Sequence, residues 1–449
     1  MSISYKDYNE KYRTPEQEFS EQLLLKRKHF ILGFEPGKGK SYPVIHAIME
    51  IQRLKEKPIS VLILSNARCI KDMWKAEIET QYILPKDTYY VTDRTAIGNV
   101  KEALLRKHWD VIVCDECQSL RSGVTRAKTK YAKLVHALTK KTEYVFGMTG
   151  TLSGNNYIEP WCVIHNLNIA GMGEISTNTF RYKFCVLELQ YGPFGSFQKP
   201  TQLNESGQAL MEAVYDRGVM FWGYDDDDTS MPPFEKDYKV FKVPKTREYE
   251  NALEGILKLN DNESTVIKAA AIQKAQQALN GFMYYNDENG RQVYYIKDYV
   301  NPKIEYVLER AKSMSKCLIV AYRFQEDYVL LNKALVEAGI ENVMTVQEFK
   351  QLLSQGKKCV LLLQCSKGNS VNIQECQDII YYTCDFSFIN FKQMMHRCWR
   401  RDQKEKCSIM FLINDVDDNE KVEYRIWSSL QTKQNIHNLL MSIKQGGAL

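Results

Sequence analysis

Residues 30–41, FILGFEPGKGKS, combine the residue types that bind phosphate groups in proteins. Gly37 and Gly39 allow backbone N–H groups to close around phosphate oxygens. Lys40 would supply a positive charge to the β and γ phosphates, and the Ser41 hydroxyl would bind Mg²⁺. An apolar run precedes this turn and a helix-compatible segment follows it, which is the context that a phosphate loop requires. We therefore predict a phosphate loop at this position.

A pair of carboxylates follows another apolar run, in VIVCDECQS at residues 111–119. If the run is a parallel strand, Asp115 and Glu116 lie at its carboxyl end, where such sheets bind ligands. Asp115 would hold Mg²⁺, and Glu116 would polarise the attacking water. Because Phe34 replaces the first glycine of the phosphate-loop pattern, the loop taken alone could be a basic turn. The loop and the acidic pair together predict a site for a nucleotide and Mg²⁺.

Two arginines and two glutamines occur at fixed spacing in QMMHRCWRRDQ, namely Gln393, Arg397, Arg400 and Gln403. On a helix, residues 393, 397 and 400 would share one face. Arginine suits a γ phosphate because it stays charged and can donate two hydrogen bonds as negative charge redistributes in the transition state. We expect both arginines to act as arginine fingers. The alternative is a solvated basic helix face.

Two parts of the chain alternate short β-rich runs with helix-like stretches. Between residues 29 and 150 the runs are HFILGF, VLILS, TYYVT, VIVCDE and EYVFGMTG, and residues 42–54 and 125–140 have helical patterns. After residue 316 the runs are KCLIVAY, KCVLLLQC, DIIYYTC and SIMFLI, and residues 325–338 have a helical pattern. This alternation predicts two parallel α/β lobes.

The middle of the chain, residues 160–300, is rich in aromatic residues and is interrupted by glycine and proline. It contains four consecutive aspartates, which we interpret as a solvated loop, and an alanine- and glutamine-rich helical stretch at 264–280. We interpret this part as the end of the first lobe, a linker and a helical insertion. The expected organisation is a first lobe, a linker with a helical insertion, and a second lobe with C-terminal helices, at residues 1–225, 226–300 and 301–449.

Charge and composition limit the function classes. The net charge of the 449 residues is +5, which permits a phosphate-backbone partner without requiring one. The twelve cysteines are scattered, and the one C-x-x-C, from Cys114 to Cys117, has no second pair nearby, so neither zinc nor disulfides are expected. No apolar run approaches the roughly 20 residues that span a bilayer, and the polar start is unlike a signal or transit peptide. We expect a soluble, intracellular protein that does not enter a membrane.

The motifs, in this order, resemble those of superfamily 2 helicases and, within them, of Swi/Snf-type DNA translocases. TPEQEF at 14–19 resembles the adenine-reading segment of the family, which implies that Gln17 hydrogen-bonds the base. Residues 61–78 are similar to a strand and helix of the family whose loop faces DNA, with Trp74 and Glu77 in a W-x-x-E pattern. The short distances between motifs resemble compact members encoded by bacteriophages and large DNA viruses.

Two further motifs extend the resemblance. FGMTGTLSGN resembles the Thr-Gly-Thr motif that couples the nucleotide site to the nucleic-acid site, which implicates Thr149 and Thr151. KGNSVNI resembles the motif that contacts the nucleic-acid backbone and the lobe interface, which implicates Gly368, Ser370 and Asn372. The departures from the family pattern are Ser41 in place of threonine, Cys117 and Gln118 after the acidic pair, and Asp402 before Gln403. They leave the subfamily open and remove no catalytic group.

The resemblance implies a fold and a mechanism. The fold would consist of two tandem RecA-like lobes, each a parallel sheet flanked by helices, with a small helical and aromatic insertion between them. ATP would bind between the lobes, where Lys40, Ser41 and Asp115 would hold its phosphates and Mg²⁺. Arg397 and Arg400 would complete the site on closure, and repeated closure would move the protein along one strand of double-stranded DNA. The implied protein is a duplex-DNA-stimulated ATPase and translocase that remodels DNA or protein–DNA complexes, in the host cytoplasm or nucleoid if phage or virus encoded.

Three other functions are weighed against this one. A strand-separating DNA or RNA helicase would share the motifs, and the sequence names no wedge hairpin that would distinguish it. A non-hydrolysing adaptor would bind nucleic acid through the same lobes, but Lys40 and Glu116, one of which such chains lose, are both present. A partner-recruiting scaffold would rest on the aromatic segment at residues 180–222.

Overall fold

The computed structural model describes residues 14–79, 82–98, 100–124, 127–152, 158–192, 195–223, 232–257, 265–288, 290–367, 373, 375–385, 387–399, 403, 405–416 and 421–442. The chain divides into two compact units, with the main boundary at residues 225–226. Each unit contains a six-stranded sheet. The remaining described strands form two sheets of two strands each.

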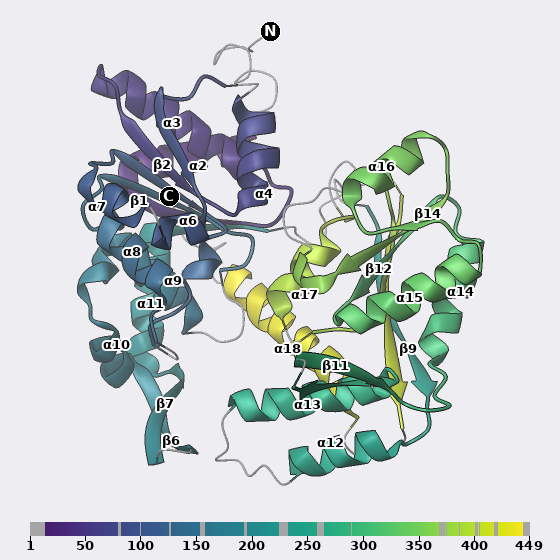
Figure 1. The fold of residues 1–449 in the computed structure, drawn as a ribbon. Helices are drawn as coiled ribbons and strands as arrows, with labels where there is room; N and C mark the ends of the chain where they lie inside the picture. Colours follow the sequence, from purple (N-terminus) through teal and green to yellow (C-terminus); the bar gives the residue numbers. More distant parts are fainter. Residues whose placement is uncertain are drawn as a thin grey trace. The chain divides into compact units, whose positions relative to one another are not determined.

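The first unit is built on a parallel sheet (Figure 1). In spatial order its strands are β3 (Asp87–Val91), β2 (Ser60–Leu64), β4 (Val111–Asp115), β5 (Tyr144–Met148), β1 (His29–Phe34) and β8 (Val219–Trp222). All neighbouring pairs run parallel, so the carboxyl ends of the strands share one edge of the sheet. Strands β2 and β4 are buried at every position, as expected for strands covered on both faces. The five strands expected before residue 150 are confirmed.

The two faces of this sheet carry separate cores, because successive side chains of a strand point to opposite sides. On β4, Val111 and Val113 belong to one core, and Ile112 and Cys114 belong to the other. The first face is covered by α2 (Pro15–Arg27), α3 (Ser41–Lys55), α4 (Ala67–Cys69) and the π-helix η1 (Ile70–Ile78). The second is covered by α6 (Asp93–Ile97), α7 (Lys101–Arg106), η2 (Cys117–Leu120), α8 (Lys130–Thr139), α9 (Glu159–Asn166), η3 (Ile169–Glu174), α10 (Thr177–Phe184) and α11 (Glu205–Gly218).

The aromatic segment expected at residues 180–222 belongs largely to the first unit. It contains the hairpin β6 (Cys185–Gly192) and β7 (Gly195–Leu203), which Figure 1 shows beyond α10, away from the large sheet. Helix α11 follows the hairpin and leads into β8, which pairs with β1 at the edge of the sheet. The segment therefore ends in β8, the edge strand of the first sheet.

The second unit is built on another parallel sheet of six strands. In spatial order they are β13 (Asn342–Val343), β14 (Cys359–Gln364), β12 (Cys317–Tyr322), β15 (Asp378–Tyr381), β16 (Cys407–Asp415) and β9 (Phe234–Lys242). The four strands expected after residue 316 form β12, β14, β15 and β16. Its helices are α12 (Arg247–Leu257), α13 (Thr265–Leu279), α14 (Pro302–Ser313), α15 (Gln325–Glu337), α16 (Val346–Ser354), η4 (Cys365–Lys367), α17 (Phe388–Met395) and α18 (Val422–Ser442).

Strand β9 corrects the expectation that residues 226–300 form only a linker and a helical insertion. It pairs in parallel with β16 along its whole length, from Phe234 opposite Cys407 to Lys242 opposite Asp415. The sequence FEKDYKVFK gave no strand signal, because most of its side chains are exposed at the edge of the sheet and an edge strand needs no apolar run. The same range also contains the hairpin β10 (Phe282–Asp287) and β11 (Gly290–Tyr295) beside the expected helical stretch.

The helices of both units are short or carry many polar residues. Over the described ranges, none combines the length and the apolar composition needed to cross a membrane. Within the same ranges, no group of three or more His, Cys, Asp or Glu side chains could hold a metal ion. The predicted motifs of the first unit lie at the carboxyl ends of its parallel strands.

Candidate active site

The predicted phosphate loop connects β1, which ends at Phe34, with α3, which begins at Ser41. Gly37 and Gly39 have backbone φ angles of +89° and +68°, a region that residues with a side chain rarely adopt. A Cβ atom on Gly39 would also lie 2.5 Å from the Nε2 atom of Gln17. The two glycines are therefore required by the shape of this loop.

The N-terminus of α3 is suited to an anion. Lys40 occupies the N-cap, and no side chain caps the first turn by a hydrogen bond. No acidic residue lies in that turn, so the turn itself adds no negative charge. The first N–H groups of a helix have no partner within it, and the helix dipole adds positive potential. The loop and the helix start can therefore bind phosphate oxygens.

Gln17 joins helix α2 to the phosphate loop. Its Nε2 atom donates to the backbone oxygen of Lys38 at 3.2 Å, and its Oε1 atom accepts from the backbone N–H of Thr14 at 3.2 Å. The Thr14 hydroxyl in turn accepts from the backbone N–H of Gln17, which completes a capping box at the start of α2. In this arrangement Gln17 supports the loop, and its reading of adenine remains a prediction.

Asp115 lies at the carboxyl end of β4 and is almost fully buried. Its Oδ2 atom accepts hydrogen bonds from the Ser65 hydroxyl at 2.8 Å and from the Trp74 indole at 3.4 Å. Burial and, second, the negative charge of Glu116 raise the pKa of Asp115 to about 6, while the positive charge of Lys40 opposes the shift. A cation next to this carboxylate would therefore be stabilised.

Trp74 supports Asp115 and is itself buried in the core. It lies in the nine-residue π-helix η1, a rare form that occurs frequently at functional sites. Ser65, at the end of the neighbouring strand β2, was not singled out in the sequence because a lone serine carries no signal. The side chain of Glu77, the other member of the expected W-x-x-E pattern, lies outside the described residues.

Glu116 follows in a left-handed backbone conformation, with φ 51° and ψ 47°. Its Oε2 atom accepts a hydrogen bond from the Gln118 amide at 2.6 Å. The Oε1 atom of Gln118 accepts from the Thr149 hydroxyl at 2.7 Å, and that hydroxyl also accepts from the backbone N–H of Thr151 at 3.0 Å. A chain of hydrogen bonds therefore runs from Glu116 to the end of β5.

In the sequence, Gln118 is visible only as a departure from the helicase pattern that the motifs resemble. Its spacing of two residues from Glu116 gives no indication of the partner, because Thr149 is 31 residues away. The contact arises because β4 and β5 are neighbours in the sheet and both end at this edge. Sequence reasoning could have found it only by pairing the two strand ends.

The third strand end at this edge is that of β1, the neighbour of β5. The backbone N–H of Thr149 donates to the oxygen of Leu32 at 3.0 Å. A Cβ atom on Gly150 would lie 3.0 Å from the Cδ atom of Pro36 in the phosphate loop. The loop, the acidic pair and the Thr-Gly-Thr turn are thus brought together within the first unit.

The Ser41 hydroxyl and the Asp115 carboxylate provide oxygen atoms of the kind that Mg²⁺ binds. The Ser41 hydroxyl donates to the Sδ atom of Met73 at 3.6 Å, a weak hydrogen bond that a metal ion could replace. The raised pKa of Asp115 also reflects a carboxylate whose negative charge is poorly compensated. These residues fit a Mg²⁺ ion that completes its coordination with phosphate oxygens and water.

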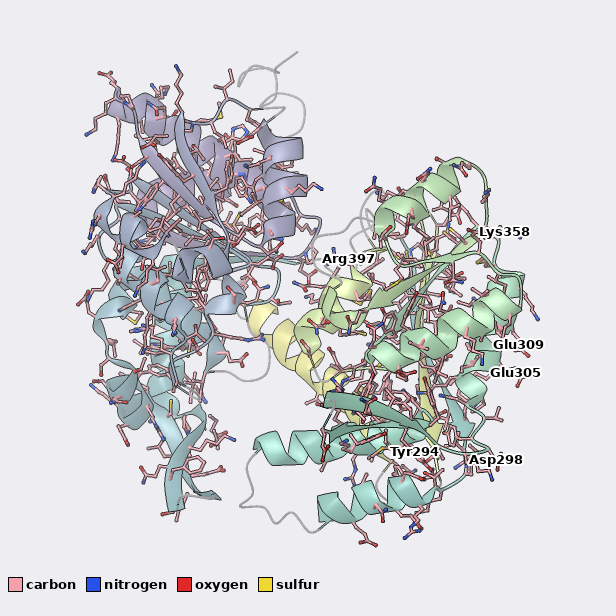
Figure 2. The ribbon with its side chains drawn as sticks, viewed as in Figure 1. Tyr294, Asp298, Glu305, Glu309, Lys358 and Arg397 are labelled. Atoms are coloured by element: carbon pink, nitrogen blue, oxygen red, sulfur yellow. The ribbon has the colours of Figure 1, made fainter. Side chains whose placement is uncertain are left out.

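In the second unit, Gln393 lies on α17 and Arg397 lies just beyond the end of that helix (Figure 2). Both side chains are largely buried. The expectation that residues 393, 397 and 400 share a helical face is wrong, because α17 ends at Met395. Arg400 lies outside the described residues, as do Gly368, Ser370 and Asn372.

The side chains after α17 pack within the second unit. Cys398 is buried in the core of the unit. The Trp399 ring packs against Phe234 at 4.9 Å between ring centroids, and its indole N–H donates to the oxygen of Pro232 at 2.9 Å. Both partners of Trp399 lie at or just before the start of β9, so the sequence could not reveal these contacts without β9.

The structure was compared with known proteins. It is similar to the Hef helicase domain of Pyrococcus furiosus, with a TM-score of 0.51 and 11% sequence identity over 96% of this chain and 100% of that one. It is also similar to the SWI2/SNF2 ATPase core of Sulfolobus solfataricus in complex with dsDNA, with a TM-score of 0.40 and 16% identity over 95% and 92% of the two chains. No protein-family model matches the chain, and no curated protein matches it. The likeness to the Hef domain shows the fold of this chain, two tandem RecA-like lobes that are each built on a parallel sheet flanked by helices.

Proposed function

We propose that this chain is an ATP-hydrolysing motor that translocates on double-stranded DNA and remodels DNA or protein–DNA complexes. The observation that carries the proposal is the hydrogen-bonded chain from Glu116 through Gln118 to Thr149 beside the phosphate loop. Such a chain can transmit a change at the nucleotide site from the end of β4 to the end of β5. The helicase fold supports nucleic acid as the partner, and the resemblance of the motifs to Swi/Snf-type translocases favours duplex DNA.

In the proposed reaction, the N–H groups of the loop and of the α3 start bind the phosphates, and Lys40 adds a positive charge. Mg²⁺, held by Ser41 and Asp115, would supply further positive charge to the phosphate oxygens when bound. Glu116 acts as the general base. Because Gln118 donates to Oε2, it orients the carboxylate so that Oε1 can accept the proton of the attacking water.

The remaining site residues have proposed roles that follow from the resemblance. Arg397 and Arg400 stabilise the negative charge that develops on the γ phosphate, and Gln393 contacts the nucleotide. Thr149 and Thr151 couple hydrolysis to nucleic acid. Three residues contact the nucleic-acid backbone, namely Gly368, Ser370 and Asn372.

Steady-state ATP hydrolysis tests the proposal. Turnover is measured at low salt without nucleic acid and with duplex DNA, single-stranded DNA or RNA. We expect duplex DNA to stimulate hydrolysis most, and Glu116→Gln to abolish turnover while ATP still binds, because only the general base is removed. Preference for single strands or RNA would instead indicate a strand-separating helicase. The absence of hydrolysis under every condition would indicate a binding protein or scaffold.

A further inference from the structure

The phosphate loop contains a second lysine, Lys38, whose position differs from that of Lys40. The side chain of Lys38 is buried, with 3% of its surface exposed. Its Nζ atom lies 4.8 Å from the centroid of the Trp222 ring. Trp222 is the last residue of β8, the edge strand of the first sheet. A buried ammonium group therefore connects the loop to the end of a strand more than 180 residues later in the sequence.

Other contacts hold the same part of the loop to Trp222. The backbone N–H of Glu35 donates to the oxygen of Trp222 at 3.0 Å. The Phe34 ring meets the Trp222 ring edge to face, at 5.1 Å between centroids and an interplanar angle of 86°. Phe34 and Trp222 are also paired in register between β1 and β8. The entrance of the loop is thus fixed to β8 by backbone and side chain.

The opposite side of Lys38 is also fixed. Its backbone oxygen accepts the hydrogen bond of Gln17, and its backbone N–H donates to the oxygen of Glu35 at 3.2 Å. Lys38 therefore lies between α2 and β8, and it stands next to Gly39, whose backbone must stay in the left-handed region. A loop that is held in its binding conformation before the ligand arrives loses less entropy on binding.

We propose that Lys38 is a positioning residue, whose ammonium group on the Trp222 ring holds the phosphate loop in its nucleotide-binding conformation without contacting the nucleotide. The inference rests on the proposed function, because it concerns the same nucleotide site. An indole ring attracts a cation through the negative face of its π system, and the attraction grows when water is excluded. The role differs from that of Lys40, which is assigned to the phosphates.

Four variants test this division of roles. Lys38→Met removes the charge and keeps the length of the side chain, and Trp222→Leu removes the aromatic face. We expect each to raise the KM for ATP and the dissociation constant of a fluorescent ATP analogue about 10-fold, the size of a desolvated cation–π contact. We expect kcat to change less than about twofold, because the lost interaction is the same in ground and transition states. Lys38→Arg and Trp222→Phe, which keep a cation and an aromatic face, should stay near the native values.

The double variant and a control make the test specific. Lys38→Met combined with Trp222→Leu should be no worse than either single change, because both remove one contact. Lys26→Met, on the exposed side of α2, should bind and hydrolyse ATP like the native protein. Thermal unfolding of each variant identifies any that fail to fold. If Trp222→Leu does not fold, the KM and kcat of Lys38→Met still test the positioning role of Lys38.

Three results would overturn the inference. If Lys38→Met lowers kcat while Trp222→Leu behaves like the native protein, Lys38 contacts the phosphates directly. If neither change affects binding while Lys40→Met abolishes it, the contact has no positioning role and the proposed function still stands. If the native protein binds no nucleotide, the proposed function fails, and the inference fails with it. The Lys40→Met measurement separates these cases.

Discussion

Gln118 connects the acidic pair to the end of the neighbouring strand. Its amide N–H group donates to Glu116 and its oxygen accepts from Thr149, so the direction of both hydrogen bonds is fixed by the donors and acceptors available. The residue is 7% exposed, so water does not compete effectively for these bonds. A buried amide in this position can hold the general base in one orientation.

Replacing Gln118 should therefore uncouple the site. Gln118→Ala removes a hydrogen bond to a charged group worth about 2 kcal/mol, and we expect DNA-stimulated kcat to fall about 10- to 100-fold. Thr149→Val should lose stimulation as well, whereas Thr149→Ser, which keeps the hydroxyl, should retain most of it. Ser119→Ala, an exposed neighbour, serves as the control. Unchanged stimulation in Gln118→Ala would remove the coupling role of this chain.

The raised pKa of Asp115 predicts how kcat/KM for ATP falls at acidic pH. Burial first, and the charge of Glu116 second, raise the pKa of Asp115 to about 6. The ionised carboxylate is the form that binds Mg²⁺, so kcat/KM for ATP should fall as the pH drops through about 6, close to tenfold per pH unit below it. The measurement is kcat/KM between about pH 5 and pH 8, with circular dichroism to verify folding. A flat profile down to pH 5 would contradict it.

At the scale of elements, the phosphate loop depends on helices and strands that flank it. Helix α2 supports it through Gln17, β8 through Trp222, and the turn after β5 through the close approach of Gly150 to Pro36. The glycine-rich backbone alone has many accessible conformations. The surrounding elements therefore select the conformation in which phosphates can bind.

The contact of Gln17 with the loop predicts that replacing Gln17 weakens the binding of every nucleotide, whatever its base. Gln17→Ala removes the capping-box partner of Thr14 and the bond to Lys38, and should cost about 1 kcal/mol of stability. If Gln17 acts only through the loop, the KM values for ATP and GTP should rise by the same factor. If it also reads adenine, the ATP to GTP preference should fall. Gln22→Ala, exposed on the same helix, is the matched control, and native-like KM values in Gln17→Ala would contradict both roles.

At the scale of the whole molecule, the second unit has a buried charged network at its carboxyl sheet edge. Lys303 on α14 is fully buried, and its Nζ atom lies 2.7 Å from a carboxylate oxygen of Glu423 on α18. The same Nζ atom donates to the oxygen of Tyr382, which follows β15, at 3.1 Å. Glu423 also accepts from the backbone N–H of Asn414 at the end of β16. The network joins four elements of one unit.

Breaking this ion pair should destabilise the second unit strongly. Lys303→Met leaves the Glu423 carboxylate buried without its cation, at a cost of about 3–5 kcal/mol. Lys303→Met with Glu423→Gln should recover part of the loss, because no charge is then left unpaired. Unfolding in urea should show the shift in the transition of the second unit, and Lys312→Met, exposed on the same helix, should show none. Equal losses in the single and double variants would contradict this account.

Features that depend on near neighbours in the chain could be predicted from the sequence. Strand β1, the glycine turn and α3 follow from the local run of apolar residues, glycines and a helix start, and Asp115 at the end of β4 follows from its own strand. These features need no knowledge of the fold, because backbone conformation and side-chain alternation act over a few residues. The alternation of such segments predicted two parallel α/β lobes, and the resemblance of the motifs to those of helicases implied that the lobes are RecA-like.

Contacts between residues far apart in the chain could not be predicted, because they depend on how the strands are ordered in each sheet. The hydrogen bond from Thr149 to Gln118 and the contact of Lys38 with Trp222 depend on the order of strands in a sheet. Strand β9 was not predicted because it is an exposed edge strand, and its conformation depends on pairing with β16. The contact of Trp399 with Phe234 likewise joins a residue after α17 to the start of β9. Packing partners far apart in the chain, which no local pattern encodes, settled each of these points.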